Sequence, residues 1–336
     1  MIARPREYWI DSVKTIACVL VVTGHLLQSL TMSGILENTV MYNWFNQTIY
    51  IFHVALFFIC SGYLYQLKTV NSNKTKWTDN VQKKAISLGV PYFVFSTITW
   101  CLKSVFAASV NNQVDSLFST LFLKPLSPYW YLYCIFIIYC ITITIHGSRQ
   151  MIFLLAASLL MKGIAIQLSN NLNAIIYMVF SNEIWFVLGM CLQYLNIVPK
   201  IKNVTHNIGY IGIFVFLILS WLLREEINGW YSFGLCILIC ASIVVIEVTR
   251  NKSVLLVNCI SQYFFPIFVM HTLIAAPIRI LLLHFHIHVV AIHVLVGLMA
   301  SFFGPIVIIK LMEKMRWPLF FVYPTKIDAV RKHLNW

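Results

Sequence analysis

The chain has 336 residues, of which 60% are hydrophobic and 10% are charged, and its mean hydropathy is +0.81. Soluble domains carry about 25% charged residues, so this composition indicates a membrane protein and excludes a sizeable soluble domain. The formal net charge of +13 would suit nucleic-acid binding, but the basic residues gather in alternate loops between apolar stretches, which is a pattern of membrane topology.

Apolar stretches long enough to cross a bilayer, at about twenty residues each, recur along the whole chain. They fall near residues 9–30, 47–67, 86–107, 129–146, 150–168, 174–196, 207–223, 230–248, 259–283 and 288–311. We therefore predict an all-α polytopic membrane protein with about ten transmembrane helices. We expect a single integral-membrane domain over residues 1–336 with no appended soluble domain, and a first stretch that is retained rather than cleaved as a signal peptide.

The basic residues predict the orientation of these helices. With a cytoplasmic N-terminus, the outside loops hold only Lys124 and Arg224, and Arg279 lies near an outer helix end. The inside segments then hold Arg4, Arg6, Lys68, Lys74, Lys76, Lys83, Lys84, Arg149, Lys200, Lys202, Arg250, Lys252, Lys310, Lys314, Arg316, Lys326, Arg331 and Lys332. By the positive-inside rule, both termini are expected in the cytoplasm.

The first apolar stretch, "YWIDSVKTIACVLVVTGH" at residues 8–25, carries charges that cost at least about 2.5–3.5 kcal/mol each at the centre of a bilayer. At about 100° per residue, Lys14 and His25 lie about 20° apart around the helix axis, and Asp11 lies within about 60° of Lys14. The three side chains form one polar stripe, which is expected to face a bundle interior or a water-filled cavity. A purely structural alternative is that Asp11 and Lys14 pair at the interface while His25 bonds a neighbouring helix.

The second stretch, "IYIFHVALFFICSGYLY" at residues 49–65, places His53 near its outer end, at a depth similar to that of His25. Two histidines at one depth on consecutive antiparallel helices indicate a buried site. Further inward, Ser61 and Gly62 form a small step at which another helix or a ligand can approach closely.

These residues resemble the acyltransferase family 3 of integral membrane proteins, especially its branch of polysaccharide O-acetyltransferases, which includes enzymes like fucose 4-O-acetylase. The family's first helix carries an aspartate and then a basic residue separated by ten residues from a histidine, matched by Asp11, Lys14 and His25. Its second helix resembles "FHVALFFICSGY" at residues 52–63. These two motifs, in order and at matching spacing, are the most specific part of the resemblance.

Later motifs extend the resemblance over most of the chain. "PYWYLYCIFIIY" at residues 128–139 is similar to a segment that opens a later helix, and "PIFVMHTLI" at residues 266–274 is similar to a late helix whose motif ends in histidine, here His271. One motif departs from the family, which often has two arginines three residues apart before the third helix. In "KKAISLGVPY" at residues 83–92, Lys84 matches the first arginine and Ser87 replaces the second, so the bidentate fork of arginine is missing there.

The resemblance implies an enzyme of the bacterial inner membrane that transfers an acetyl group from cytoplasmic acetyl-CoA to a sugar hydroxyl. The acceptor would be an envelope glycan (O-antigen, exopolysaccharide or common antigen) or a lipid-linked sugar. Acetyl-CoA is then a co-substrate, and no bound cofactor is expected. A histidine suits the base, because its ordinary pKa is about 6.5. His25 is expected either to activate the acceptor hydroxyl or to carry the acetyl group, and the sequence leaves both routes open.

The remaining candidates bind substrate or donor in this interpretation. Lys83 and Lys84, together with Lys14, supply positive charge for the phosphates of CoA at the inner face, and Asp11 would hold Lys14. His53 would orient His25 or the sugar, and Trp130 (with Tyr131) would offer a stacking surface. The other candidates are Ser61 at the small step, the intramembrane Glu183, and His271. Glu183 has a structural alternative, which is to pair with Lys103 or Lys162.

Metal binding is not expected. The nine cysteines all fall inside apolar stretches, where they act as small apolar fillers, and the pair Cys236 and Cys240 has no third ligand near it in the sequence. The histidines of "HFHIH" at residues 284–288, with His293 beyond, have no carboxylate or cysteine close by. The main alternative function is a proton-coupled transporter or exporter, since buried Asp, Lys, Glu and His also build proton relays.

Overall fold

The structure, a computed structural model, describes residues 7–70, 77–107, 115–226, 229–250, 257, 260–316 and 319–325. Within these ranges every regular element is a helix and no strand occurs, which confirms the all-α prediction. Eight helices of the described part are long and apolar enough to cross a membrane. Of the basic residues considered above, Arg4, Arg6, Lys74, Lys76, Lys252, Lys326, Arg331 and Lys332 lie outside the described residues, as does Cys259.

The long helices are α1 (Tyr8–Met32), α2 (Val40–Val70), the segment made of α3 (Trp77–Lys84), the π-helix η1 (Ala85–Gly89) and α4 (Val90–Val105), then α7 (Ser148–Gln167), α8 (Ala174–Tyr194), α11 (Trp230–Arg250), α13 (Phe264–His284) and α14 (Val290–Lys314). Two shorter apolar helices, α6 (Trp130–Ile141) and α10 (Asn207–Leu222), fall on the other two predicted stretches. Three further helices are short, namely α5 (Leu117–Phe122), α9 (Ile197–Ile201) and η3 (Leu319–Phe321).

The chain divides into two compact units. The first comprises Met1–Val21, Thr39–Asn73 and Ile143–Phe264, and the second comprises Val22–Asn38, Lys74–Thr142 and Phe265–Trp336. Helix α1 runs unbroken from Tyr8 to Met32 and contributes residues to both units. The single functional domain and the cytoplasmic termini stay predictions.

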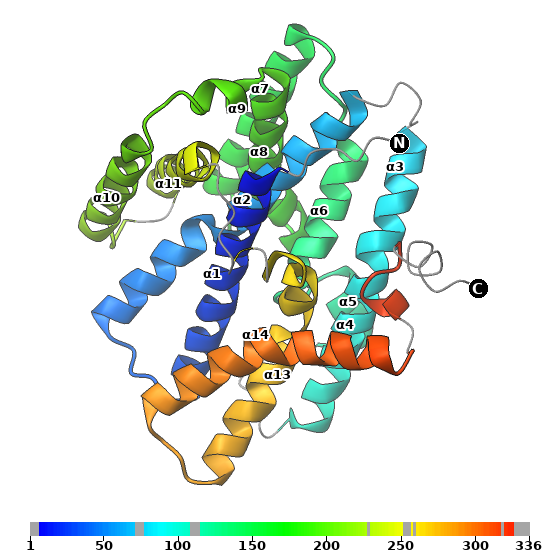
Figure 1. Cartoon of the computed structure of the whole chain (residues 1–336), viewed down its shortest axis with the longest axis vertical. Helices are drawn as coiled ribbons and strands as arrows, with labels where there is room; N and C mark the ends of the chain where they lie inside the picture. The colour runs from blue at the N-terminus through cyan, green and yellow to red at the C-terminus, as the bar shows by residue number, and fades with distance from the viewer. Residues whose placement is uncertain are drawn as a thin grey trace. The chain divides into compact units, whose positions relative to one another are not determined.

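Helix α2 packs along α8 in the first unit (Figure 1). Glycines permit the close approach on both sides. A Cβ placed on Gly62 would overlap the backbone carbonyl oxygen of Phe186, and a Cβ on Gly189 would overlap that of Ile59. The small step predicted at Ser61 and Gly62 is therefore filled at Gly62 by another helix.

The chain after α6 is extended where the apolar stretch 129–146 predicted a longer helix. Residues 142–146 are not helical, and the buried Gln66 side chain of α2 bonds the backbone of Ile145 on both sides. Its amide nitrogen donates to the Ile145 carbonyl at 2.6 Å and its oxygen accepts from the Ile145 N–H at 3.0 Å. A side chain thus satisfies backbone groups that the helix would otherwise have paired.

In the second unit, α13 and α14 follow one another through a short connection, seen in gold and orange in Figure 1. Helix α13 remains continuous although Pro277 lies inside it. A glycine again sets the packing of α14, because a Cβ on Gly297 would come within 2.8 Å of the Leu26 side chain of α1.

Candidate active site

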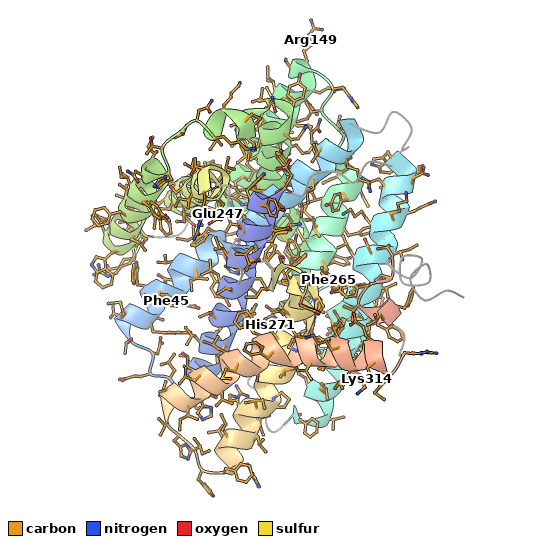
Figure 2. All side chains as sticks on the ribbon, in the orientation of Figure 1. Phe45, Arg149, Glu247, Phe265, His271 and Lys314 are labelled. Carbon is orange, nitrogen blue, oxygen red and sulfur yellow. The ribbon has the colours of Figure 1, made fainter. Side chains whose placement is uncertain are left out.

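A cluster of His25, His271 and Ser127 lies within the second unit. The His25 and His271 ring centroids are 5.4 Å apart with the rings tilted by 33°. Ser127 Oγ lies 3.4 Å from His25 Nε2. His271 is almost fully buried, His25 is half-buried and Ser127 is exposed, so the cluster extends from the interior of the unit to its surface. Figure 2 labels His271 on α13.

The tautomer of His271 follows from its hydrogen bonds. Its Nδ1 lies 3.0 Å from the carbonyl oxygen of Ile267 and 2.9 Å from that of Phe268. Carbonyl oxygens only accept, so Nδ1 carries the proton and Nε2 is the accepting nitrogen of the neutral ring. Within the described residues Nε2 is buried and has no hydrogen-bond partner. A buried lone pair of this kind is available to a substrate hydroxyl or to a proton in transit.

Tyr129, the residue immediately before α6, connects the elements around this cluster. Its hydroxyl is fully buried, lies 2.9 Å from Thr99 Oγ1 of α4, and donates to the backbone oxygen of Val269 of α13 at 3.1 Å. Val269 comes two residues before His271, and Tyr129 comes two residues after Ser127. One phenol therefore fixes the spacing between the Ser127 turn and the His271 helix.

A buried arginine fixes the register between α1 and α13. Arg279 Nη1 donates to both the backbone oxygen and the hydroxyl of Ser29, at 3.1 Å and 2.8 Å. Ser29 lies one turn beyond His25 on α1, and Arg279 is 5% exposed. These bonds help to keep the faces carrying His25 and His271 toward each other.

The other polar residues predicted on α1 lie in the first unit. Lys14 Nζ is 5.5 Å from the centroid of the Phe264 ring, and Cys18 Sγ is 3.8 Å from the Phe264 backbone oxygen. Asp11 is half-buried, and its backbone oxygen accepts from the Thr15 hydroxyl at 2.8 Å. Ser61, predicted at the small step of α2, is half-buried in the same unit.

Lys83 and Lys84 end α3 immediately before the π-helix η1. Lys83 is exposed, whereas Lys84 is half-buried with its Nζ 4.2 Å from the Tyr139 ring centroid. Ser87, which stands where the family often has arginine, lies within η1, and its hydroxyl is 3.5 Å from the Lys84 carbonyl oxygen. Single-turn π segments are frequent at functional sites. Trp130, the first residue of α6, is half-buried.

His53 and Glu183 are both buried in the first unit. His53 Nδ1 bonds the Ile49 carbonyl oxygen at 2.8 Å, and its ring meets Tyr50 edge-on at 4.8 Å between centroids. Glu183 lies on α8, two residues after Ser181, whose backbone oxygen accepts from Lys162 Nζ at 3.1 Å. The Lys162 ammonium is also 5.9 Å from the Trp185 ring centroid. Lysine 162 thus reaches the turn of α8 that carries Glu183.

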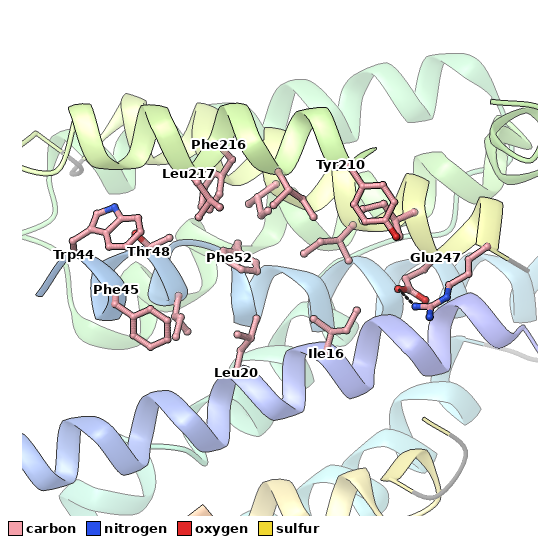
Figure 3. A pocket seen from close by; sticks show the side chains of 16 residues that line it. Ile16, Leu20, Trp44, Phe45, Thr48, Phe52, Tyr210, Phe216, Leu217 and Glu247 are labelled. Carbon is pink, nitrogen blue, oxygen red and sulfur yellow. Dashed lines mark ion pairs between the residues drawn. The ribbon is translucent and has the colours of Figure 1, made fainter. Parts of the chain in front are cut away.

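A cavity of about 400 Å³ opens between α1, α2, α10 and α11 of the first unit (Figure 3). Apolar side chains dominate its lining, and Glu247 and Arg250 form an ion pair of 4.0 Å at one end. The lining is suited to hydrocarbon rather than to a sugar or a phosphate. The histidine cluster, and not this cavity, offers the polar groups that act on a hydroxyl.

Of the histidines at and beyond the "HFHIH" motif, His293 is the buried one. His293 Nε2 lies 2.8 Å from the Ile287 carbonyl oxygen. The described residues contain no group of three His, Cys, Asp or Glu side chains that is placed to hold a metal ion. Cys236 and Cys240 lie together, with their sulfurs 3.9 Å apart.

Sequence reasoning did not single out Ser127, Tyr129 or Arg279 as part of this site. The sequence contains a signal for Arg279, because an arginine inside an apolar stretch needs a polar partner. The only sequence signal for Ser127 and Tyr129 was their position, immediately before and inside the motif at residues 128–139. Their importance depends on contacts with α1, α4 and α13, far away in the chain.

Apolar helices that carry buried histidines and a nearby hydroxyl define a class of multi-pass membrane proteins equipped for general-base chemistry. Comparison with known proteins narrows that class. A family model described as "Acyltransferase domain" matches residues 7–310, and the chain belongs to this family, acyltransferase family 3. Its long apolar helices fit a multi-pass membrane member of that family.

The chain is similar to nodulation protein NolL of Mesorhizobium japonicum (strain LMG 29417 / CECT 9101 / MAFF 303099), with 29% identity over 154 residues. The matched region covers 46% of this chain and 40% of NolL. The similarity therefore extends over less than half of either protein. No solved structure matches the chain.

Proposed function

We propose that the protein is an O-acetyltransferase of the bacterial inner membrane. It moves the acetyl group of cytoplasmic acetyl-CoA to a sugar hydroxyl of an envelope glycan or of a lipid-linked sugar. The observation that carries this proposal is the His25, His271 and Ser127 cluster in a chain that belongs to an acyltransferase family. Acetyl-CoA acts as a co-substrate, and the reaction needs no bound cofactor.

His25 supplies the base in this proposal. Its ring takes the proton of an attacking hydroxyl while the oxygen adds to the thioester carbonyl, and the carbon–sulfur bond then breaks. The departing thiolate of CoA receives the proton. The geometry suits this role because a hydroxyl, that of Ser127, already lies 3.4 Å from His25 Nε2. His271, with its accepting Nε2 buried beside His25, is placed to bind the acceptor hydroxyl.

The donor is held by positive charge. Lys14, Lys83 and Lys84 are our candidates for the phosphates of CoA, and Asp11 for orienting Lys14. An ammonium group binds phosphate as a point charge, so these lysines give attraction without the directional fork of arginine. His53, Ser61, Trp130 and Glu183 remain candidates for contacts with donor or acceptor.

Measuring ester-linked acetate on the surface glycan tests the proposal. Wild type, His25→Ala and the control His206→Ala are expressed in a host that lacks its own enzyme, with their membrane levels matched. His206 is exposed and belongs to the first unit, where it precedes α10. We expect wild type and the control to add acetate and His25→Ala to lose at least about 100-fold of the rate. Equal acetylation by His25→Ala would remove His25 from the chemistry.

A proton-coupled transporter is the second candidate, because His53 and Glu183 are buried titratable groups within membrane-crossing helices. Membrane vesicles separate the two functions. A dependence of product on acetyl-CoA supports the enzyme. Accumulation of a sugar inside vesicles without acetylation supports the transporter.

A further inference from the structure

We propose that Ser127 is a transient acyl carrier, whose Oγ accepts the acetyl group with His25 Nε2 as the base and then passes it to the sugar hydroxyl. This inference rests on the proposed acetyltransferase function and names a residue and an intermediate within it. Ser127 lies in the turn that precedes α6.

The first observation is the pairing of a hydroxyl with an imidazole. Ser127 Oγ and His25 Nε2 are 3.4 Å apart, although their residues are 102 positions apart in the chain. A nucleophile and its base are normally within about 2.6–3.2 Å, and the distance is often longer before substrate binds. The two atoms are thus close enough for proton transfer after a small adjustment.

The second observation is the support around this pair. The Tyr129 hydroxyl bonds α4 and α13 and so anchors the turn that carries Ser127. The His271 ring packs against that of His25 and is itself fixed by two carbonyl oxygens. A nucleophile and a base that neighbouring groups hold in place form an activated nucleophile site.

The exposure of the two residues suits a carrier. Ser127 is exposed while His25 is half-buried, so an acetyl group on Ser127 lies at the surface of the unit and beside the base. A serine ester is more stable in water than an acyl-imidazole. The acetyl group can therefore remain on Ser127 after CoA has dissociated and until an acceptor binds.

Each transfer step balances. In the first, Ser127 Oγ forms a bond to the thioester carbonyl carbon, His25 Nε2 takes the hydroxyl proton, the carbon–sulfur bond breaks, and the proton passes to the CoA thiolate. In the second, a sugar hydroxyl attacks the ester carbonyl and His25 takes its proton. The bond from carbon to Ser127 Oγ then breaks, and the proton returns to Oγ.

The test traps the acetylated enzyme. The full-length purified protein in lipid nanodiscs is mixed with isotope-labelled acetyl-CoA without acceptor, quenched in acid and analysed by intact mass and peptide mapping. We expect wild type to gain one labelled acetyl group on the peptide that contains Ser127. Ser127→Ala and His25→Ala should gain none. The control Ser119→Ala removes a hydroxyl that donates to the Asp115 side chain, in a loop that we predict to be external, and should behave as wild type.

Glycan acetylation by the same variants separates this inference from the proposed function. We expect Ser127→Ala to lose at least about 100-fold of the rate, and Ser127→Cys, which keeps a nucleophilic atom, to retain the labelled acetyl group as a thioester. Full glycan acetylation by Ser127→Ala would overturn the carrier and leave the acetyltransferase function standing. Label on the His25 peptide, or acetylation of glycan by a wild type that never gains label, would also overturn it. A wild type that uses acetyl-CoA in neither assay would overturn both proposals.

Discussion

At the scale of single residues, Tyr129 joins three helices of the second unit through one hydroxyl. Replacing it by phenylalanine keeps the ring, which stacks on Phe95 at 6.5 Å, but leaves the buried Thr99 hydroxyl without this partner and the Val269 carbonyl without its donor. Loss of a buried hydrogen-bond partner costs about 1–3 kcal/mol. We expect Tyr129→Phe to lower the melting temperature in detergent and to reduce glycan acetylation. Tyr177→Phe, at an exposed position of α8, should change neither.

Lys84 offers a second prediction at this scale. If it binds a CoA phosphate, Lys84→Ala should raise the KM for acetyl-CoA by about tenfold, equivalent to about 1.4 kcal/mol, with little change in kcat. Lys84→Arg should keep the KM near that of wild type, since the charge remains and a bidentate contact becomes available. Steady-state kinetics with varied acetyl-CoA measure both. An unchanged KM in Lys84→Ala would assign this lysine to its contact with Tyr139 alone.

The sequence identified His25 and His271 from motifs, but it did not predict their pairing. His25 and His271 approach each other only because α1 and α13 adopt particular rotations, which Arg279 and Ser29 help to fix. Helical periodicity predicts which residues share a face of one helix, but it does not predict which residues of another helix that face contacts. For the same reason, the role of Ser127 and Tyr129 emerged only from the three-dimensional contacts.

At the scale of elements, the contact of α2 with α8 depends on two glycines. Gly62→Ala or Gly189→Ala would place a Cβ on a backbone carbonyl oxygen, which cannot move aside as a flexible side chain can. Overpacking of this kind costs about 1–3 kcal/mol or more, so we expect a lower melting temperature and less protein in the membrane. Gly234→Ala on α11 is the matched control, because a Cβ there meets nothing within 4 Å. A melting temperature for Gly62→Ala equal to that of the control would contradict this packing.

Most helices could be predicted because apolar stretches of sufficient length leave few alternatives in a bilayer. The stretch 129–146 shows where this reasoning fails. Its end is as apolar as a helix requires, yet Gln66 of a distant helix pairs with the backbone at Ile145. An apolar composition predicts burial, whereas the end of a helix depends on where each backbone group finds its partner.

At the scale of the whole molecule, the distribution of lysine and arginine predicts the orientation in the membrane. A single cysteine introduced at Ser116, before α5, should react with an impermeant maleimide added to intact cells, and one at Glu313, near the end of α14, should react only after lysis. Both positions are exposed. Among the native cysteines of the described chain, Cys101 is exposed and should be replaced first to lower the background. The opposite labelling pattern would reverse the assigned sides of donor and acceptor.

The uninterrupted course of α1 constrains how the protein can vary. Lys14 and His25 belong to one continuous helix. Inserting a single residue between them would advance His25 by about 1.5 Å and rotate it by about 100° around the helix. Substitutions between these two positions leave the angle between Lys14 and His25 around the helix axis unchanged. An insertion or a deletion changes that angle. The length of this stretch should therefore be far less tolerant of change than its individual residues.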